Sequence, residues 1–323
     1  MRAIVQSGYG SAHVLGLAEI AKPEISANEV LVKVQAAGMD RGTWHMMTGL
    51  PYLIRIMGFG FRGPKDPVPG RDVAGTVDSV GSAVTRFQAG DEVFGISRGS
   101  FAEYAAARED KLAHKPAGLS FEQAAVVPIS GGTAIQGLHD AGRIQAGQKV
   151  LIIGASGGVG TYAVQLAKAL GAEVTGVCST AKVDLVRSIG ADHVVDYTRE
   201  DFADGAPGYD LILDIGGNSR LSRLRRALAP KGTLVIVGGE EGGKWTGGFG
   251  RQIRALGLSL FVRQRLTMLS SKEHYTHIEA VGRFIEAGQV DPIVGETYTL
   301  AEVPDAMRHL EAGKARGKIS ITI

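Results

Sequence analysis

The pattern of apolar and polar positions changes twice along the chain. Over the first 120 residues, short apolar runs such as Val30–Val34, Val73–Val80 and Phe101–Ala105 are separated by glycine and proline, which is typical of strands joined by turns. From about Glu122, strand-like runs alternate with helix-like segments of roughly ten residues. The runs are Lys149–Ile153, Val174–Cys178, His193–Asp196, Leu211–Asp214 and Leu234–Val237. This alternation predicts βαβ units and a parallel sheet.

The end of the chain returns to an extended pattern. Segments 291–298 and 318–323 are predicted to be extended, with a helix near Val303–Ala312 between them. We therefore expect the tail to leave the α/β domain and rejoin the β-rich one. The predicted organisation is a β-rich domain of residues 1–120 and 286–323, with a doubly wound α/β domain of residues 121–285 between its two parts. A chain of 323 residues fits two hydrophobic cores.

Composition narrows the classes of function. With 44% apolar and 21% charged residues, the chain is expected to be soluble and globular. A formal net charge of +2 gives no reason to expect nucleic-acid binding, and we interpret the arginines at 223, 225 and 226 as a solvated helix face. No run reaches the roughly 20 apolar residues that span a bilayer, and no signal-peptide core follows Met1. A cytoplasmic protein without a membrane span is expected.

Metal-binding residues are sparse. Cys178 is the only cysteine, so neither an intrachain disulfide nor a thiolate zinc site is expected. Eight histidines are mostly scattered, and the one close pair, His274 and His277, has no third ligand nearby. The sequence predicts no metal site.

A glycine-rich segment follows the first strand of the expected parallel sheet. Lys149–Ile153 leads directly into Gly154-Ala-Ser-Gly-Gly-Val-Gly160, and a helix with an apolar period follows until Gly171. Glycines let the backbone approach a pyrophosphate, whose charge the N–H groups of the helix start attract. The segment predicts a dinucleotide-binding loop, with a structural turn as the alternative. Its expected cofactor contacts are Gly154, Ser156, Gly157, Gly158, Val159 and Gly160.

The residues after the second strand of this sheet indicate which nicotinamide cofactor binds. An NAD site usually carries an acid there, but here no acid occurs before Asp184. Ser179, Thr180 and Lys182 would instead hold a 2′-phosphate. An alternative, compatible with the first, is that Ser179 or Thr180 caps the helix expected at 182–189. The expected cofactor is NADPH/NADP+.

These segments together resemble the medium-chain dehydrogenase/reductases, and within them the zinc-free quinone-oxidoreductase-like branch. The likeness extends along almost the whole chain in matching order. It is carried by Pro69–Val77 with Val80 and Gly81, Phe87–Phe94, Ser100–Tyr104, Ala124–Ala134, the glycine-rich loop and Ala315–Ile319.

Three departures from the zinc-dependent relatives are informative. Those relatives carry a cysteine in the segment that here is Ala36–Thr43, a histidine where Arg71 stands, and a four-cysteine structural lobe. None of these occurs here, so zinc-dependent alcohol oxidation has no ligand set. The zinc-free branch often shows Asn-x-x-Asp where this chain has Asp40-Arg-Gly-Thr43. We interpret Arg71 and Asp72 as a structural salt bridge.

The resemblance implies a GroES-like fold for the β-rich domain and a Rossmann fold for the other. It also implies NADPH-dependent reduction of a quinone or an α,β-unsaturated carbonyl compound by an enzyme that forms a homodimer. By position, Val159 would back the nicotinamide, while Thr133, Gly238 and Gly239 would lie near its carboxamide. Tyr197 matches a family tyrosine beside the adenosine phosphate, with a half-buried strand-end aromatic as the alternative.

No side chain stands out as an obligatory proton donor. The catalytic residues are therefore unknown at this stage, with Asp40, Thr43, His45 and Tyr52 as candidates. The apolar insertion 52–61 would roof a hydrophobic substrate or pack against a partner chain or a membrane. Segment 239–250 is placed to form a lid, with a disordered surface loop as the alternative. The competing hypothesis is an NADPH-binding sensor or scaffold without turnover.

Overall fold

The computed structural model describes residues 1–204, 208–217, 219–239 and 243–323. The chain divides into two compact units. Unit 1 comprises Met1–Gly132, Glu273–Glu286 and Pro292–Ile323, and unit 2 comprises Thr133–Lys272 and Ala287–Asp291. The expected domain division at residues 120 and 286 stays a prediction, and segments 121–132 and 273–286 lie in the β-rich unit.

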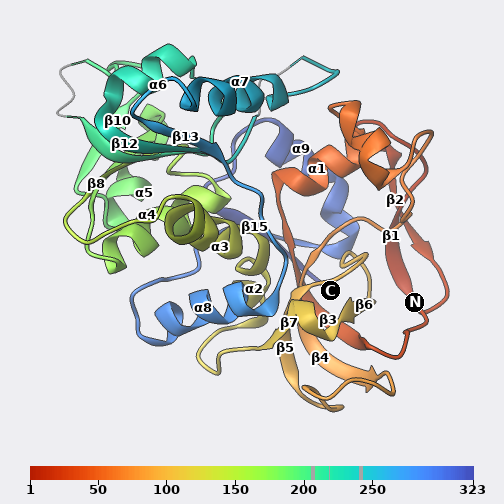
Figure 1. Ribbon diagram of the computed structural model, residues 1–323. Coiled ribbons are helices and arrows are strands. Elements are labelled where there is room, and N and C mark those ends of the chain that lie inside the picture. The colour runs from red at the N-terminus through yellow and green to blue at the C-terminus, as the bar shows by residue number, and fades with distance from the viewer. Residues whose placement is uncertain (205–207, 218, 240–242) are drawn as a thin grey trace. The chain divides into compact units, whose positions relative to one another are not determined.

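Unit 2 is built on a parallel sheet (Figure 1). In the part of the chain that the structure describes, its strands lie in the order β10-β9-β8-β11-β12-β13. The strands are β8 (Lys149–Ile153), β9 (Glu173–Cys178), β10 (His193–Asp196), β11 (Tyr209–Asp214), β12 (Leu228–Ile236) and β13 (Arg265–Met268). The chain order of the strands changes direction between β8 and β11. β8 pairs with β9 on one side and with β11 on the other, in parallel in both cases. The predicted doubly wound Rossmann order is confirmed.

The sheet of unit 2 is buried on both faces. Val150, Leu151 and Ile152 of β8 have no exposed surface, as the near-continuous apolar run predicts for a covered central strand. The helices of this unit are α4 (Gly158–Ala169), α5 (Val183–Ser188), α6 (Leu221–Ala227) and α7 (Phe249–Ser259). α4 buries Ala163 and Leu166 and ends before Gly171, whose φ of +82° suits glycine.

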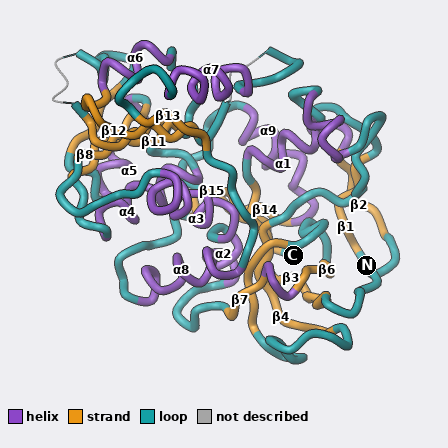
Figure 2. Tube along the Cα trace, viewed as in Figure 1, coloured by secondary structure: helices purple, strands orange, loops and turns teal. Residues whose placement is uncertain are grey.

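Unit 1 contains a largely antiparallel sheet (Figure 2). Its described strands lie in the order β14-β15-β3-β4-β5-β7, with β6 also paired to β3. They are β3 (Glu29–Met39), β4 (Asp72–Val80), β5 (Glu92–Ile96), β6 (Tyr104–Arg108), β7 (Leu112–His114), β14 (Val294–Thr299) and β15 (Lys318–Thr322), beside the hairpin of β1 (Arg2–Gln6) and β2 (Leu15–Glu19). Ile319 of β15 lies opposite Met39 of β3, so the prediction that the tail rejoins the β-rich part is confirmed.

The expected elements and the observed ones differ mainly at their ends. The strand expected over 101–105 begins only at Tyr104, because Ala102 makes an isolated bridge to Ala3 instead. The helices of unit 1 are α1 (Arg41–Thr48), α2 (Phe121–Ala125), α8 (Tyr275–Glu286) and α9 (Val303–Glu311), and α3 (Pro128–Ile135) crosses the division between the units. Within the described ranges, no helix combines the length and the apolar character needed to cross a membrane.

A buried group of three charges joins separate segments of unit 1. Lys318, at the start of β15, places Nζ 2.8 Å from Asp72 Oδ2 and 3.8 Å from Asp40 Oδ2. Asp72 begins β4, and its second oxygen accepts a hydrogen bond from the N–H of Ile129 in α3. Lys318 is 2% exposed and Asp72 is 1% exposed. The ammonium therefore holds the ends of β4, β15 and the start of α1 together.

The shared lysine leaves the two carboxyl groups unequal. Burial raises the pKa of Asp72 to about 6, although Lys318 opposes the shift. Burial also acts on Asp40, but Lys318 and the Thr43 hydrogen bonds outweigh it and hold the pKa of Asp40 below its usual range. Burial lowers the pKa of Lys318 while both carboxylates raise it, and the net pKa is raised. At neutral pH, Lys318 and Asp40 are charged.

Replacing Lys318 with methionine is expected to lower the free energy of unfolding by about 3–5 kcal/mol, because two buried carboxyl groups lose their cation. Chemical denaturation of both proteins measures this difference. Lys314→Met, at an exposed position before the same strand, is the matched control and should change stability by less than about 0.5 kcal/mol. Equal effects of the two substitutions would contradict a role for the buried cation.

Candidate functional site

The glycine-rich loop makes a tight turn at the carboxyl end of β8. Gly154 has φ +89°, a conformation that side chains other than glycine rarely adopt. A Cβ atom on Gly160 would lie 2.1 Å from the carbonyl oxygen of Gly154, so this close contact also requires glycine. Gly157 precedes α4 as its N-cap residue. The loop thus brings the start of α4 against the end of β8 without side chains in between.

The loop lies at the point where the strand order reverses. Gly154 follows β8 and Gly216 follows β11, and a Cβ on Gly154 would come within 3.1 Å of the Gly216 nitrogen. Parallel sheets of this kind bind ligands at the carboxyl ends of the strands at such a point. A cavity of about 860 Å³ opens there within unit 2. Its lining includes Ile153, Gly154, Ser156, Cys178, Ser179, Lys182, Tyr197, Gly216, Arg220 and Arg223.

The residues expected to hold a 2′-phosphate divide into two groups. Ser179 and Lys182 line the cavity, and Ser179 makes no capping hydrogen bond to the turn Thr180–Lys182. Thr180 is not among the lining residues, because its hydroxyl donates to Asp196 at 2.5 Å. Tyr197, which is 58% exposed, lines the cavity as well. The cavity therefore contains a hydroxyl and an ammonium group at the end of β9.

Two arginines that sequence reasoning missed also line this cavity. Arg220 is exposed at the start of α6, and Arg223 lies one turn further along the helix. Arg223 pairs with Asp201 at 2.7 Å and stacks on Phe202 at 4.2 Å from the ring centroid. The interpretation of the arginine cluster as a solvated face is therefore wrong for Arg223. The residues next to Arg223 in the sequence do not indicate these contacts, because Asp201 and Phe202 come from an earlier segment.

A buried ion pair fixes the loops that follow β11 and β12. Asp214, with no exposed surface, accepts a hydrogen bond from Arg251 Nη1 at 2.5 Å. Arg251 also donates to the carbonyl oxygens of Ser219 and Gly238. Gly238 and Gly239 thus lie at the carboxyl end of β12, near Gly217 and Gly248. Residues 240–242 of the expected lid lie outside the described residues.

The two remaining cofactor candidates lie on helices. Val159 is half-buried in the first turn of α4, immediately before Gly160. Thr133 is half-buried on α3, at the first position of unit 2. Their contacts with a cofactor stay predictions.

The catalytic candidates gather on α1 and the turn after it. Asp40 caps α1 and accepts hydrogen bonds from the Thr43 N–H at 2.8 Å and the Thr43 hydroxyl at 3.0 Å. An ionised, buried Asp40 does not donate a proton at neutral pH. His45 Nδ1 lies 2.7 Å from the Leu50 carbonyl oxygen and must carry the proton, because a carbonyl only accepts. Neutral His45 therefore has an accepting Nε2.

The apolar insertion follows α1. It forms a π-helical turn over Arg55–Phe59, interrupted by the left-handed φ of +115° at Gly58. Ile56 and Phe61 are 71% and 75% exposed. Tyr52 is half-buried and lies under the guanidinium of Arg55, 4.7 Å from its ring centroid.

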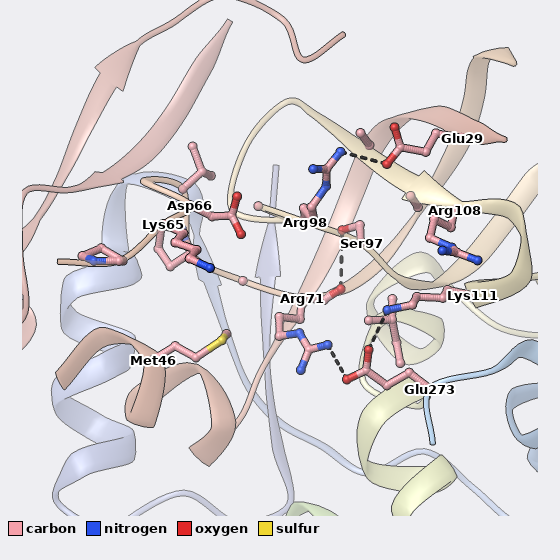
Figure 3. Close-up of a pocket in the computed structure, with 18 of the residues that line it drawn as sticks. Glu29, Met46, Lys65, Asp66, Arg71, Ser97, Arg98, Arg108, Lys111 and Glu273 are labelled. Carbon is pink, nitrogen blue, oxygen red and sulfur yellow. Dashed lines mark hydrogen bonds and ion pairs between the residues drawn. The ribbon is translucent and has the colours of Figure 1, made fainter. Parts of the chain in front are cut away.

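Arg71 and Asp72 do not pair with each other, so that part of the expectation is wrong. Arg71 pairs with Glu273, while Asp72 pairs with Lys318 (Figure 3 shows Arg71 and Glu273). Arg71 lies immediately before β4, whereas Asp72 is the first residue of that strand. Arg71 and Lys318 are cations, and in their charged forms they offer no lone pair to a metal ion. These residues do not fit a zinc ion.

Comparisons with known proteins agree with this architecture. Residues 26–117 match the model of the alcohol dehydrogenase GroES-like domain, and residues 189–321 match that of a zinc-binding dehydrogenase. The chain is 34% identical to the NADPH-dependent alkenal/one oxidoreductase of Arabidopsis thaliana and 32% identical to the 2-methylene-furan-3-one reductase of Solanum lycopersicum. Each alignment covers 99% of this chain and 79% of the relative.

A solved structure gives the same result. The quinone oxidoreductase from Coxiella burnetii superposes with a TM-score of 0.87 at 27% identity, covering 100% of this chain and 99% of the other. A Rossmann unit and a GroES-like unit in one chain define a nicotinamide-dependent dehydrogenase or reductase. The chain belongs to the medium-chain dehydrogenase/reductase superfamily, in its quinone-oxidoreductase-like branch.

Proposed function

We propose that this protein is a zinc-independent, NADPH-dependent reductase of quinones or α,β-unsaturated carbonyl compounds. The observation that carries the proposal is the cavity at the end of β8, where the glycine loop is combined with the cations Lys182, Arg220 and Arg223. A cofactor with a pyrophosphate and a 2′-phosphate matches that charge. The names of the relatives, an alkenal/one oxidoreductase and a quinone oxidoreductase, support the substrate class.

The proposed chemistry needs no metal. When bound, the nicotinamide supplies a hydride, which a conjugated system accepts at its far carbon while charge develops on oxygen. The protein's part is to orient the substrate and to supply a proton or a hydrogen bond. Asp40 and Thr43 are already bonded to each other, which leaves Tyr52, and His45 in its protonated form, as the candidates for that role. We assign Asp40 and Thr43 to shaping the start of α1.

We also propose specific cofactor contacts. Ser179, Lys182 and Tyr197 hold the 2′-phosphate end, while the glycine loop holds the pyrophosphate. Val159, Thr133, Gly238 and Gly239 lie on the nicotinamide side. Thr180 acts indirectly, since its hydroxyl ties the start of its turn to Asp196.

Lys182→Ala is expected to raise the KM for NADPH by roughly ten- to a hundredfold and to leave the KM for NADH nearly unchanged, because one charge-assisted hydrogen bond to phosphate is lost. Steady-state kinetics with both cofactors measures the ratio. Lys231→Ala, at an exposed position of the same unit outside the cavity, is the control. An unchanged ratio in Lys182→Ala would remove this residue from the phosphate site.

The purified protein is expected to oxidise NADPH in the presence of an ortho-quinone or an alkyl enone, at a rate that chelators leave unchanged. Absorbance of the reduced cofactor follows the reaction. Tight NADPH binding without turnover across a broad panel would favour the alternative, a sensor or scaffold. Loss of activity on chelation, restored by zinc, would contradict zinc independence.

We further propose a homodimer formed through unit 2. β13 is the edge strand of the described sheet, and Leu260 and Phe261, just before it, are 83% and 85% exposed. Such an edge next to large apolar side chains supports self-pairing across a two-fold axis. We propose the cytoplasm as its location, supported by the single free thiol of Cys178, which suits a reducing compartment.

Phe261→Glu is expected to convert the dimer to a monomer, because two buried carboxylates would face each other across the axis. Sedimentation velocity at micromolar concentration measures the mass. Leu17→Glu, on an exposed position of β2, is the control and should remain dimeric. A wild-type monomer would contradict the proposal outright.

A further inference from the structure

A second cavity, of about 480 Å³, lies entirely within unit 1 (Figure 3). Apolar side chains such as Met46, Val68 and Ile96 form part of its wall. Among the described residues that line it, five are cationic and three are acidic. The cations are Lys65, Arg71, Arg98, Arg108 and Lys111, and the acids are Glu29, Asp66 and Glu273.

The charges at one side of this cavity are unbalanced. Glu273 is shared by two cations: Arg71 donates to Oε1, and Lys111 Nζ lies 2.9 Å from Oε2. The three side chains are 29–30% exposed, so solvent screens them less than it screens surface charges. Burial raises the pKa of Glu273, but Arg71 and Lys111 outweigh it and the pKa is lowered, so the carboxylate is charged. Two cations therefore share one lining carboxylate, while Asp40 and Asp110, which also act on Arg71 and Lys111, do not line the cavity.

The donors at this place exceed the acceptors. A guanidinium carries five N–H groups and an ammonium carries three, more than one carboxylate can accept. Glu273 is fixed by these cations at the start of the segment that joins unit 1 before α8. On another side, Arg98 pairs with Glu29 at 2.8 Å, and this pair is balanced. Among the residues that line the cavity, Arg71 and Lys111 are thus the cations that share a single carboxylate, and the same cavity has an apolar wall.

We propose that this cavity binds an anionic oxygen group, a carboxylate or a phosphate, against Arg71 and Lys111, and that the substrate carries this group. The apolar wall at Met46 and Val68 then receives the hydrocarbon part of the same molecule. The volume lies in the range of about 300–1,000 Å³ that is typical of small-molecule sites. The claim that the substrate carries the anionic group rests on the proposed function, whereas the claim that the cavity binds an anion does not.

A matched pair of substrates tests the source of the anion. The probes are a nine-carbon aliphatic enone and the same enone with a terminal carboxylate. The wild type is expected to prefer the carboxylate by about tenfold in kcat/KM, mainly through KM, which corresponds to one ionic hydrogen bond. Lys111→Met should abolish most of this preference, measured as the ratio of kcat/KM for the two enones. Lys33→Met, an exposed cation of β3 outside the cavity, is the matched control.

Glu273→Gln is expected to change the preference for the carboxylate enone in the direction opposite to that of Lys111→Met. Removing the resident carboxylate frees both cations, so the preference for the carboxylate enone should increase several-fold. If the ion pairs only stabilise the fold, the same substitution would lower the melting temperature and leave the preference unchanged. That outcome, measured alongside Lys111→Met, would overturn the proposal.

Calorimetric titration with inorganic phosphate at constant ionic strength separates a free anion from a substrate group. Phosphate binding that Lys111→Met weakens supports the anion site even if neither enone is reduced, an outcome that tells only against the proposed function. If the two enones react equally and phosphate binds, a free anion is the occupant and the substrate part of the proposal is wrong. Equal reaction of both enones without phosphate binding overturns the proposal while the proposed function stands.

Discussion

The close contact between Gly160 and the carbonyl oxygen of Gly154 is the constraint on which the cofactor site depends. No Cβ atom fits into this contact, and the left-handed turn at Gly154 excludes most other residues as well. Because β8 is a central strand, the turn also fixes the position of the loop relative to β9 and β11. Ile153, Gly154, Cys178 and Ser179, which line the cavity, lie where β8 and β9 end.

The local part of this arrangement could be predicted from the sequence. The strand Lys149–Ile153, the glycine loop and the amphipathic helix are contiguous, so periodicity and spacing were sufficient to place them. The strand His193–Asp196 and the return of the tail to β3 were equally accessible, since apolar runs mark them. Such signals depend only on neighbours within a few residues.

The charged contacts could not be predicted, because their partners are distant in the sequence. Nothing near Arg223 indicates that Asp201 and Phe202 draw it to the cofactor cavity. The adjacency of Arg71 and Asp72 suggested a pair, whereas the two side chains pair with Glu273 and Lys318, which lie far away in the sequence. Likewise, the sequence around Thr180 does not show that its hydroxyl donates a hydrogen bond to Asp196, which lies at the end of the neighbouring strand.

The cations Lys318 and Arg71 explain how this chain can keep the family fold without the residues of a zinc site. A metal ion in such a place would hold several segments together through its ligands. Here Lys318 holds these segments together instead, because it joins the start of β15 to Asp72 of β4 and to Asp40 before α1. An ammonium does not polarise a carbonyl as a Lewis acid does. In the proposed zinc-independent reaction the substrate itself would therefore stabilise the developing charge, as a conjugated acceptor does, so the buried Lys318 supports the proposed substrate class.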